Sequence, residues 1–176
     1  YITAEDVGVS PSDMDIISSQ TKHVAGLSKG KAASGDPSPV TAEGVFRGLL
    51  AGAKHLWGSE DLSGKTIAVQ GLGHVGYALS EKLHKSGARL IVADINNEVL
   101  DKAESELNAS RVEIGEIHAQ EADIFCPCAL GGVLNAQNVP DIHAKLIAGA
   151  ANNQLASEEV MPLLEKRNIT YLPDFV

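Results

Sequence analysis

A glycine-rich loop stands between an apolar run and a helical pattern in the middle of this chain. The run Thr66–Gln70 is typical of a buried strand, and Gly71, Gly73 and Gly76 follow it with the spacing G-x-G-x-x-G. The first glycine allows a tight turn, the second lets backbone N–H groups approach a pyrophosphate, and the third lets the next helix pack closely on the strand. The positive end of that helix would face the diphosphate. The loop therefore predicts a dinucleotide site.

An acidic residue at the end of the next apolar run indicates which dinucleotide would bind. Asp94 closes the run Arg89–Asp94, eighteen residues after Gly76. Its carboxylate can accept hydrogen bonds from the adenosine ribose hydroxyls and would repel a 2′-phosphate. Ile95, the next residue, is expected to contact the cofactor as well. The residues from Ile95 onward supply no arginine to receive such a phosphate, so the sequence favours NAD over NADP. The alternative is an aspartate that only caps the following helix.

Histidine and cysteine side chains elsewhere could also react or bind a metal ion, but we expect simpler roles for them. His74 and Val75 lie inside the loop, where we expect the backbone to meet the cofactor and the imidazole to point outward. Cys126 and Cys128 alternate in an apolar run and offer too few ligands for a metal ion, and no paired histidine motif lies nearby. We expect no metal site and two buried thiols in a reducing compartment.

Composition disfavours several classes of partner. The 176 residues suit one domain, or one domain and part of another. Acidic residues outnumber basic ones 23 to 14 without a Lys/Arg cluster, which disfavours nucleic acid and anionic membranes as partners. No apolar run reaches membrane-spanning length, and no signal-peptide pattern opens the chain. We expect a cytoplasmic protein whose partner is a small molecule.

The order of the elements predicts the fold that would position these residues. An early helix should start with Ser10 as N-cap and Pro11 in its first turn, after a strand that leads to a turn at Gly8, and another should run from an N-cap at Thr41 to Trp57. Strands are expected at 66–70, 89–94, 112–114, 122–126, 145–149 and 169–172. Helices are expected at 74–87, 97–106 and 157–167, with shorter ones near 115–119 and 133–138. This alternation predicts an α/β, Rossmann-like, doubly wound and mostly parallel sheet with helices on both faces.

Several runs together resemble the glutamate/leucine/phenylalanine/valine dehydrogenase family. They keep the family's order and cover nearly the whole chain: Thr3–Gly8, Ser34–Gly44, Val69–Gly76, Ala122–Gly132, Ile147–Leu155 and Tyr171–Asp174. The resemblance implies NAD-dependent oxidative deamination of an L-amino acid to a 2-oxo acid and ammonia. It also implies that residues 1–26 end a substrate domain and include a connecting helix. Residues 27–176 would be an NAD-binding Rossmann domain, truncated at its C-terminal end, in a segment of a longer polypeptide.

The resemblance assigns three residues to the substrate. Asp6 falls on the family's catalytic aspartate, which implies proton transfer at the substrate nitrogen. Asn153 resembles the amide that contacts the substrate amino group. Ala4 resembles a wall residue of the side-chain pocket, where its small size fits an aliphatic substrate.

Five further residues are assigned to the nicotinamide end of the cofactor by the same resemblance. Thr41 resembles a residue near the carboxamide, and Asn152 resembles an amide that contacts the nicotinamide ribose. The loop after the fourth strand would pass beside that ribose; it contains Cys128, Ala129 and Leu130.

The departures from the family limit the prediction. The family's two catalytic lysines lie in a Gly-Gly-Lys motif upstream of the aspartate, and Lys29 and Lys31 do not match it. The chain is therefore expected to bind NAD and to be inactive alone. We expect the whole enzyme to be a homo-oligomer that acts on a branched-chain amino acid, with L-leucine as the expected substrate. The alternatives are phenylalanine, valine or glutamate as substrate, or a non-enzymatic NAD-sensing module.

Overall fold

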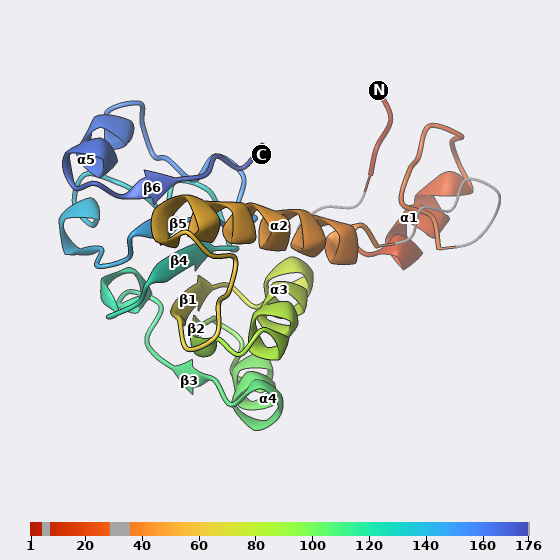
Figure 1. Ribbon diagram of the computed structural model, residues 1–176. Coiled ribbons are helices and arrows are strands. Elements are labelled where there is room, and N and C mark those ends of the chain that lie inside the picture. Colours follow the sequence, from red (N-terminus) through yellow and green to blue (C-terminus); the bar gives the residue numbers. More distant parts are fainter. Residues whose placement is uncertain (5–7, 29–35, 176) are drawn as a thin grey trace. The chain divides into compact units, whose positions relative to one another are not determined.

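A computed structural model of the chain describes residues 1–4, 8–28 and 36–175 (Figure 1). It separates into two compact units, Tyr1–Val40 and Thr41–Val176. The functional boundary expected after residue 26 concerns the roles of the two parts and stays a prediction.

The first unit contains the whole of one helix, α1 (Pro11–Ser18), among its described residues. Ser10 caps it as expected: the Ser10 hydroxyl accepts from the Asp13 N–H, and the Asp13 carboxylate accepts from the Ser10 N–H at 2.8 Å. This reciprocal pair satisfies two amide groups that the first turn cannot pair internally. The strand expected at the N-terminus is reduced, within the described residues, to one parallel bridge between Thr3 and Val24, and Gly8 lies in a turn.

The second unit is built on a parallel sheet of six strands in the order β3-β2-β1-β4-β5-β6. In chain order the strands are β1 (Thr66–Gln70), β2 (Arg89–Ala93), β3 (Ser110–Arg111), β4 (Ile124–Pro127), β5 (Leu146–Ile147) and β6 (Thr170–Tyr171). The chain starts at the centre, winds outward to β3, and returns to place β4 on the other side of β1. The winding therefore reverses between β1 and β4, which is where doubly wound sheets bind their ligands.

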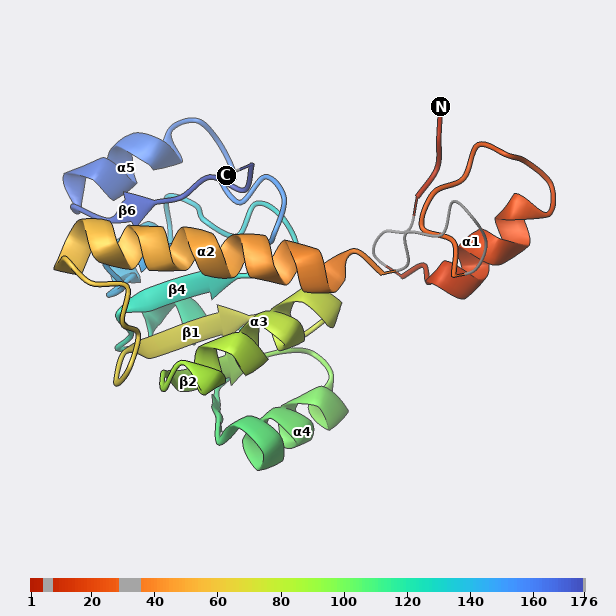
Figure 2. The same ribbon diagram turned by 45° about the vertical axis from the view of Figure 1, so that its right-hand side comes forward.

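Helices cover both faces of this sheet, and the predicted Rossmann-like class is confirmed. The larger helices are α2 (Ser38–Trp57), α3 (His74–Lys85), α4 (Asn97–Leu107) and α5 (Val160–Lys166), with short 3-10 turns at Ile117–Ala119 and Val139–Asp141. Figure 2 shows α2 running along β4 and β1. Alternate residues of β1 point to opposite faces: Ile67 and Val69 join the core under α2, α3 and α4, while Ala68 joins the core with α5 and the 3-10 turns.

The helix expected to begin at Thr41 begins at Ser38 instead. Asp36 accepts a hydrogen bond from the Ser38 N–H at 2.8 Å, and Pro39 lies in the first turn, where its fixed φ suits a helix and its missing N–H costs nothing. Thr41 is therefore inside the helix, and its expected role as N-cap is wrong.

Three short elements also differ from their predictions. The third strand lies at Ser110–Arg111 rather than 112–114, because Asn108 ends α4 in a left-handed conformation and the chain enters the sheet at once. Residues 133–138 form no helix and are followed by the 3-10 turn Val139–Asp141. The last helix spans Val160–Lys166, a shorter range than 157–167.

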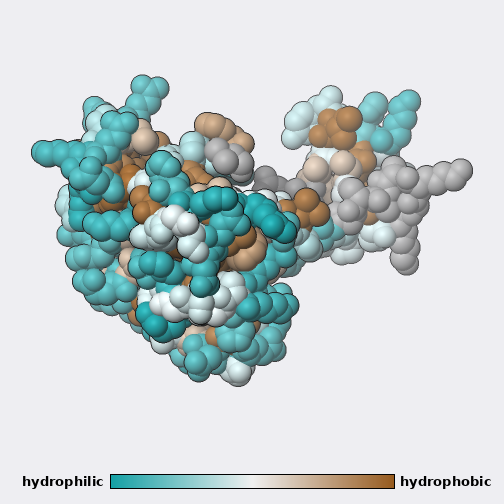
Figure 3. All heavy atoms as spheres, in the orientation of Figure 1, coloured by the Kyte–Doolittle hydropathy of each residue, from teal (hydrophilic) through white to brown (hydrophobic). Residues whose placement is uncertain are grey.

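The part of the chain that the structure describes contains no helix long and apolar enough to cross a membrane. The face of the second unit seen in Figure 3 is mainly hydrophilic, with small apolar areas.

Candidate functional site

The first position of the glycine loop, Gly71, lies in a tight turn that only glycine can adopt. Gly71 has φ +92°, in the left-handed region, and its N–H donates to the Ala93 carbonyl at 2.8 Å. A Cβ built on Gly71 would lie 2.9 Å from both the backbone N and the Cβ of Ala129. The absence of a side chain therefore brings the loop after β1 into contact with the loop after β4.

The third glycine of the motif is required for close packing. A Cβ on Gly76 would overlap the carbonyl oxygen of Gly71 and would lie 3.2 Å from the Cβ of Cys128. Helix α3 thus packs directly on the turn that precedes it, and its N-terminus is fixed relative to β1 and β4.

The second glycine has a different environment. Gly73 is the N-cap of α3 and no side chain caps the helix there. A Cβ on Gly73 would meet no atom within 4 Å, so the space in front of the helix N-terminus is open. His74 and Val75 form the first turn of α3 and so lie at its positive end. This end of the helix can receive a pyrophosphate on its backbone, with Gly73 leaving room for the approach.

Asp94 joins the glycine loop to the end of β2. One of its carboxylate oxygens accepts from the Leu72 N–H at 2.6 Å, and the other accepts from the Asn96 N–H at 2.8 Å. Capping of α4 is done by Asn96, whose side chain accepts from the Glu98 N–H at 2.9 Å, so Asp94 is not the cap of that helix. Ile95, next to it, is 88% exposed. The Asp94 carboxylate is therefore half-buried and held beside the glycine loop, and the exposed side chain of Ile95 lies next to it.

The loop after β4 forms the neighbouring wall of the site. The Cys128 N–H donates to the Gln70 carbonyl at 2.7 Å, which extends the pairing of β4 with β1 to the edge of the loop. Ala129 contacts the Gly71 turn, and Leu130 is 68% exposed. The side-chain oxygen of Gln70 is buried and has no hydrogen-bond partner among the described residues.

The two cysteines differ from the expectation of two buried thiols. Cys126 is fully buried, and burial raises the pKa of its thiol well above the ordinary value. Cys128 is only partly buried, because it follows the strand rather than lying within it. Burial raises the pKa of the Cys128 thiol to about 11, with a partly opposing hydrogen bond to the Ala150 backbone. Within the described ranges no group of three or more His, Cys, Asp or Glu side chains is placed to hold a metal ion.

The Asn152–Asn153 turn follows β5 and is fixed through its backbone. Asn153 has φ +51°, its carbonyl accepts from the Gly132 N–H at 2.8 Å, and its N–H donates to the Asp174 carboxylate at 2.9 Å. A Cβ on Gly131 would lie 2.5 Å from the Asn152 carbonyl oxygen. The loop after β4 and the turn after β5 are therefore in close contact.

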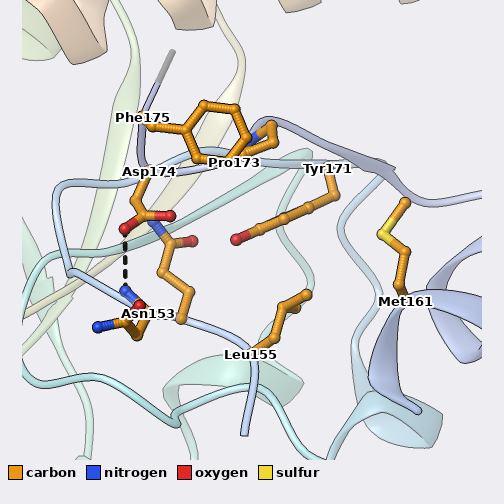
Figure 4. Close-up of a pocket in the computed structure, with 8 residues that line it drawn as sticks. Asn153, Leu155, Met161, Tyr171, Pro173, Asp174 and Phe175 are labelled. Carbon is orange, nitrogen blue, oxygen red and sulfur yellow. Dashed lines mark hydrogen bonds between the residues drawn. The ribbon is translucent and has the colours of Figure 1, made fainter. Parts of the chain in front are cut away.

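A shallow pocket of about 360 Å³ lies beside this turn (Figure 4). It is lined by Asn153, Gln154, Leu155, Met161, Tyr171, Pro173, Asp174 and Phe175. The Tyr171 ring extends across it, with its hydroxyl end toward Asp174 and Asn153 in this view. Gln154 is fully buried and donates to the Gly149 carbonyl at 2.9 Å, while its own side-chain oxygen has no partner among the described residues.

The structure brings most of the expected site residues together at the carboxyl edge of the sheet. The glycine loop contacts Asp94 and the loop after β4, and the loop after β4 contacts the turn after β5. Thr41 is an exposed residue of α2. Ala4 is exposed in the first unit, and Asp6 lies outside the described residues.

Sequence reasoning gave no role to Gln70, Gln154 or Asp174, although all three belong to the site region. Gln70 is the last residue of β1 before the glycine loop, and a polar residue there is an available clue. Asp174 is in a run that carried the family resemblance. Asp174 and Asn153 are 21 residues apart in the sequence, and no local sequence pattern predicts their contact.

Comparison with known proteins identifies relatives over the whole chain. Residues 92–176 match the model of the glutamate/leucine/phenylalanine/valine dehydrogenase family. The chain is 51% identical over 176 residues to a leucine dehydrogenase of Bacillus cereus and 50% identical to that of Geobacillus stearothermophilus. In both cases all of this chain aligns and 48% of the relative is covered, so the chain spans about half the length of these relatives.

Solved structures of amino acid dehydrogenases also superpose on nearly the whole chain. The crystal structure of L-tryptophan dehydrogenase from Nostoc punctiforme superposes with a TM-score of 0.81 at 40% identity, covering 99% of this chain and 49% of that one. A hetero-hexameric glutamate dehydrogenase from Thermus thermophilus superposes with a TM-score of 0.77 at 23% identity, covering 98% of this chain and 46% of that one, a likeness of fold alone.

Proposed function

Because the chain belongs to the glutamate/leucine/phenylalanine/valine dehydrogenase family, we propose that it is the NAD-binding part of an enzyme that deaminates a branched-chain L-amino acid. The proposed reaction converts L-leucine, water and NAD⁺ to 4-methyl-2-oxopentanoate, ammonia and NADH. The observation that carries the proposal is the surface formed by the glycine loop, Asp94 and the β4 loop at the reversal of winding. The open helix N-terminus at Gly73 and the carboxylate of Asp94 fit the pyrophosphate and a ribose of a dinucleotide.

The residues present fit NAD at the adenosine end. The open N-terminus of α3 at Gly73 would receive the pyrophosphate. Asp94 would receive the ribose hydroxyls. A carboxylate oxygen has two lone pairs, so each Asp94 oxygen can accept from a backbone N–H and still accept from a hydroxyl. A 2′-phosphate would meet this negative charge, which supports NAD over NADP.

At the other end, NAD supplies the acceptor for the hydride that leaves the substrate Cα. The loop Cys128–Leu130 and Asn152 would bind the nicotinamide ribose, and Thr41 would orient the carboxamide. Asn153 would accept from the substrate amino group through a neutral carbonyl, which avoids burying a second charge beside the ammonium. Asp6 would take and return protons at the substrate nitrogen as the imine forms and is hydrolysed.

The choice of leucine among related substrates rests on the relatives. Identity is 48–51% to the leucine dehydrogenases, compared with 43% to an L-tryptophan dehydrogenase and 40% to a valine dehydrogenase of Streptomyces albus. The small side chain of Ala4 is consistent with an aliphatic substrate. The cytoplasmic location and the homo-oligomeric state of the enzyme stay predictions.

A panel of L-amino acids tests the proposal on the full-length enzyme, with NADH formation as the readout. We expect leucine, isoleucine and valine to support NADH formation with leucine having the highest kcat/KM. The chain alone should bind NAD without turnover, because the catalytic lysine motif is not within it. A preference for phenylalanine or glutamate would contradict the leucine assignment. NAD binding without any amino-acid-dependent activity in the full-length enzyme would favour the sensing module.

A further inference from the structure

Asn153 is held in an uncommon backbone conformation by contacts on both sides of its Cα. Its φ of +51° lies in the left-handed region, which asparagine tolerates better than most residues but which still needs support from its surroundings. On the C-terminal side the Asn153 carbonyl accepts from the Gly132 N–H at 2.8 Å. On the N-terminal side the Asn153 N–H donates to an Asp174 carboxylate oxygen at 2.9 Å.

These two contacts differ in kind. The bond from Gly132 belongs to a run of backbone bonds that joins the loop after β4 to the turn after β5, together with Leu134 N–H to the Gln154 carbonyl at 2.9 Å. The bond to Asp174 links the Asn153 backbone to a side chain, and that side chain comes from the segment that follows β6. A carboxylate acceptor makes this a charge-assisted bond, stronger than a neutral one.

The Asp174 carboxylate also lies near Tyr171, the last residue of β6. Burial raises the pKa of the Tyr171 hydroxyl, and the negative charge of Asp174 raises it further. Figure 4 shows the Tyr171 hydroxyl end and the Asp174–Asn153 bond on the same side of the pocket. The charge is thus placed between the end of β6 and the turn after β5.

We propose that Asp174 is a positioning residue, which holds Asn153 in the backbone conformation that directs its amide to the substrate. This inference rests on the proposed function, because it takes the role of Asn153 at the substrate amino group from there. Fixing both peptide groups of Asn153 leaves its side chain only χ1 and χ2 to vary. Release of the N-terminal peptide would let the turn relax and misplace the amide without removing it, and small displacements of positioning groups lower rates strongly.

Three variants separate positioning from a simple structural role. Asp174→Ala removes the acceptor, and Asp174→Asn keeps a neutral acceptor of the same size. Asp141→Ala removes another exposed aspartate, in the 3-10 turn Val139–Asp141, and serves as the matched control. Each variant is made in the full-length enzyme for kinetics and in this chain for hydrogen exchange and thermal unfolding.

We expect Asp174→Ala to lower kcat/KM for the amino acid by about tenfold, the effect of losing one hydrogen bond to a charged group. The loss should fall mainly on kcat, and the dissociation constant for NAD should stay within about twofold. Asp174→Asn should recover most of the activity, and Asp141→Ala should match the unsubstituted enzyme. Amide exchange at Asn153 should accelerate in Asp174→Ala and much less in Asp174→Asn.

Two results would overturn the inference while the proposed function stands. One is an Asn153 exchange rate that does not change in Asp174→Ala. The other is full activity of Asp174→Ala in an enzyme that forms NADH normally. An unsubstituted enzyme that forms no NADH with any amino acid would instead overturn the proposed function, and with it the catalytic part of this inference.

Discussion

Three glycine-to-alanine substitutions should give three different results, because a Cβ meets different surroundings at each position. At Gly76 it would overlap the Gly71 carbonyl oxygen and press on Cys128. At Gly73 it would meet no atom within 4 Å, and at Gly44, inside α2, it would also meet none. The added methyl group is the same in all three variants, and Gly44 and Gly76 both lie inside helices, so a difference between these two reports the local packing.

The free energies of unfolding follow from two opposing effects. Alanine is favoured over glycine inside a helix by about 1 kcal/mol, because the unfolded chain loses flexibility. Gly44→Ala should therefore stabilise the chain by roughly 0.5–1 kcal/mol. At Gly76 the contact is with backbone, which cannot move aside as a side-chain end could. Overpacking costs about 1–3 kcal/mol, so Gly76→Ala should be destabilising on balance.

The same variants separate stability from cofactor binding. Gly73→Ala should leave the free energy of unfolding within about 0.5 kcal/mol of the unsubstituted chain. It should weaken NAD binding by about tenfold or more, because the methyl group occupies the approach of the pyrophosphate to the α3 N-terminus. Urea unfolding and calorimetric titration with NAD measure the two quantities. A Gly76→Ala chain as stable as the Gly44→Ala chain would contradict the close packing at Gly76. A Gly73→Ala chain with unchanged NAD affinity would contradict the placement of the pyrophosphate at Gly73.

Three further predictions concern the other walls of the site. Asp94→Ala should reduce NAD affinity by about tenfold and should narrow the preference for NAD over NADP. It should also destabilise the chain by about 1–3 kcal/mol, because the Leu72 and Asn96 amides lose their acceptor. Titration measures the first change and urea unfolding the second, and the absence of either change would contradict the role given to Asp94. Asn153→Gly should keep the free energy of unfolding within about 0.5 kcal/mol, whereas Asn153→Val should lose about 1–2 kcal/mol, because a β-branched residue is strained at φ +51°; equal unfolding midpoints would contradict this. The pKa of the Cys128 thiol is raised to about 11 in the folded chain, so the neutral thiol stabilises the fold at neutral pH, and this contribution is lost as pH rises from about 8.5 toward 11. Alkylation of Cys128 at pH 8 should therefore be slow, and a rate equal to that of free cysteine would contradict the raised pKa.

The sequence was sufficient for the features that depend on local patterns. The strand at Thr66–Gln70 and the start of α3 at His74 match their predictions, because an apolar run and three glycines at fixed spacing define both. Ser10 was identified as a cap from its own neighbours. The parallel sheet followed from alternation of strand and helix patterns.

The features that were missed depend on contacts between distant parts of the chain or on competition between neighbouring caps. The bond from the Leu72 N–H to Asp94 was not predicted, and it exists only because β2 lies beside β1. Asp174 reaches Asn153 only because β6 lies beside β5. The helix start at Ser38 rather than Thr41 reflects an aspartate and two prolines that act before the threonine.

We propose that this chain binds NAD through the glycine loop and Asp94. Calorimetric titration of the chain with NAD and, separately, with NADP tests this binding mode. We predict saturable binding of one NAD per chain, with NADP at least about tenfold weaker because of the Asp94 carboxylate. Equal affinity for both cofactors would show that Asp94 does not face the ribose, and absence of NAD binding would contradict the proposal that this chain holds the cofactor.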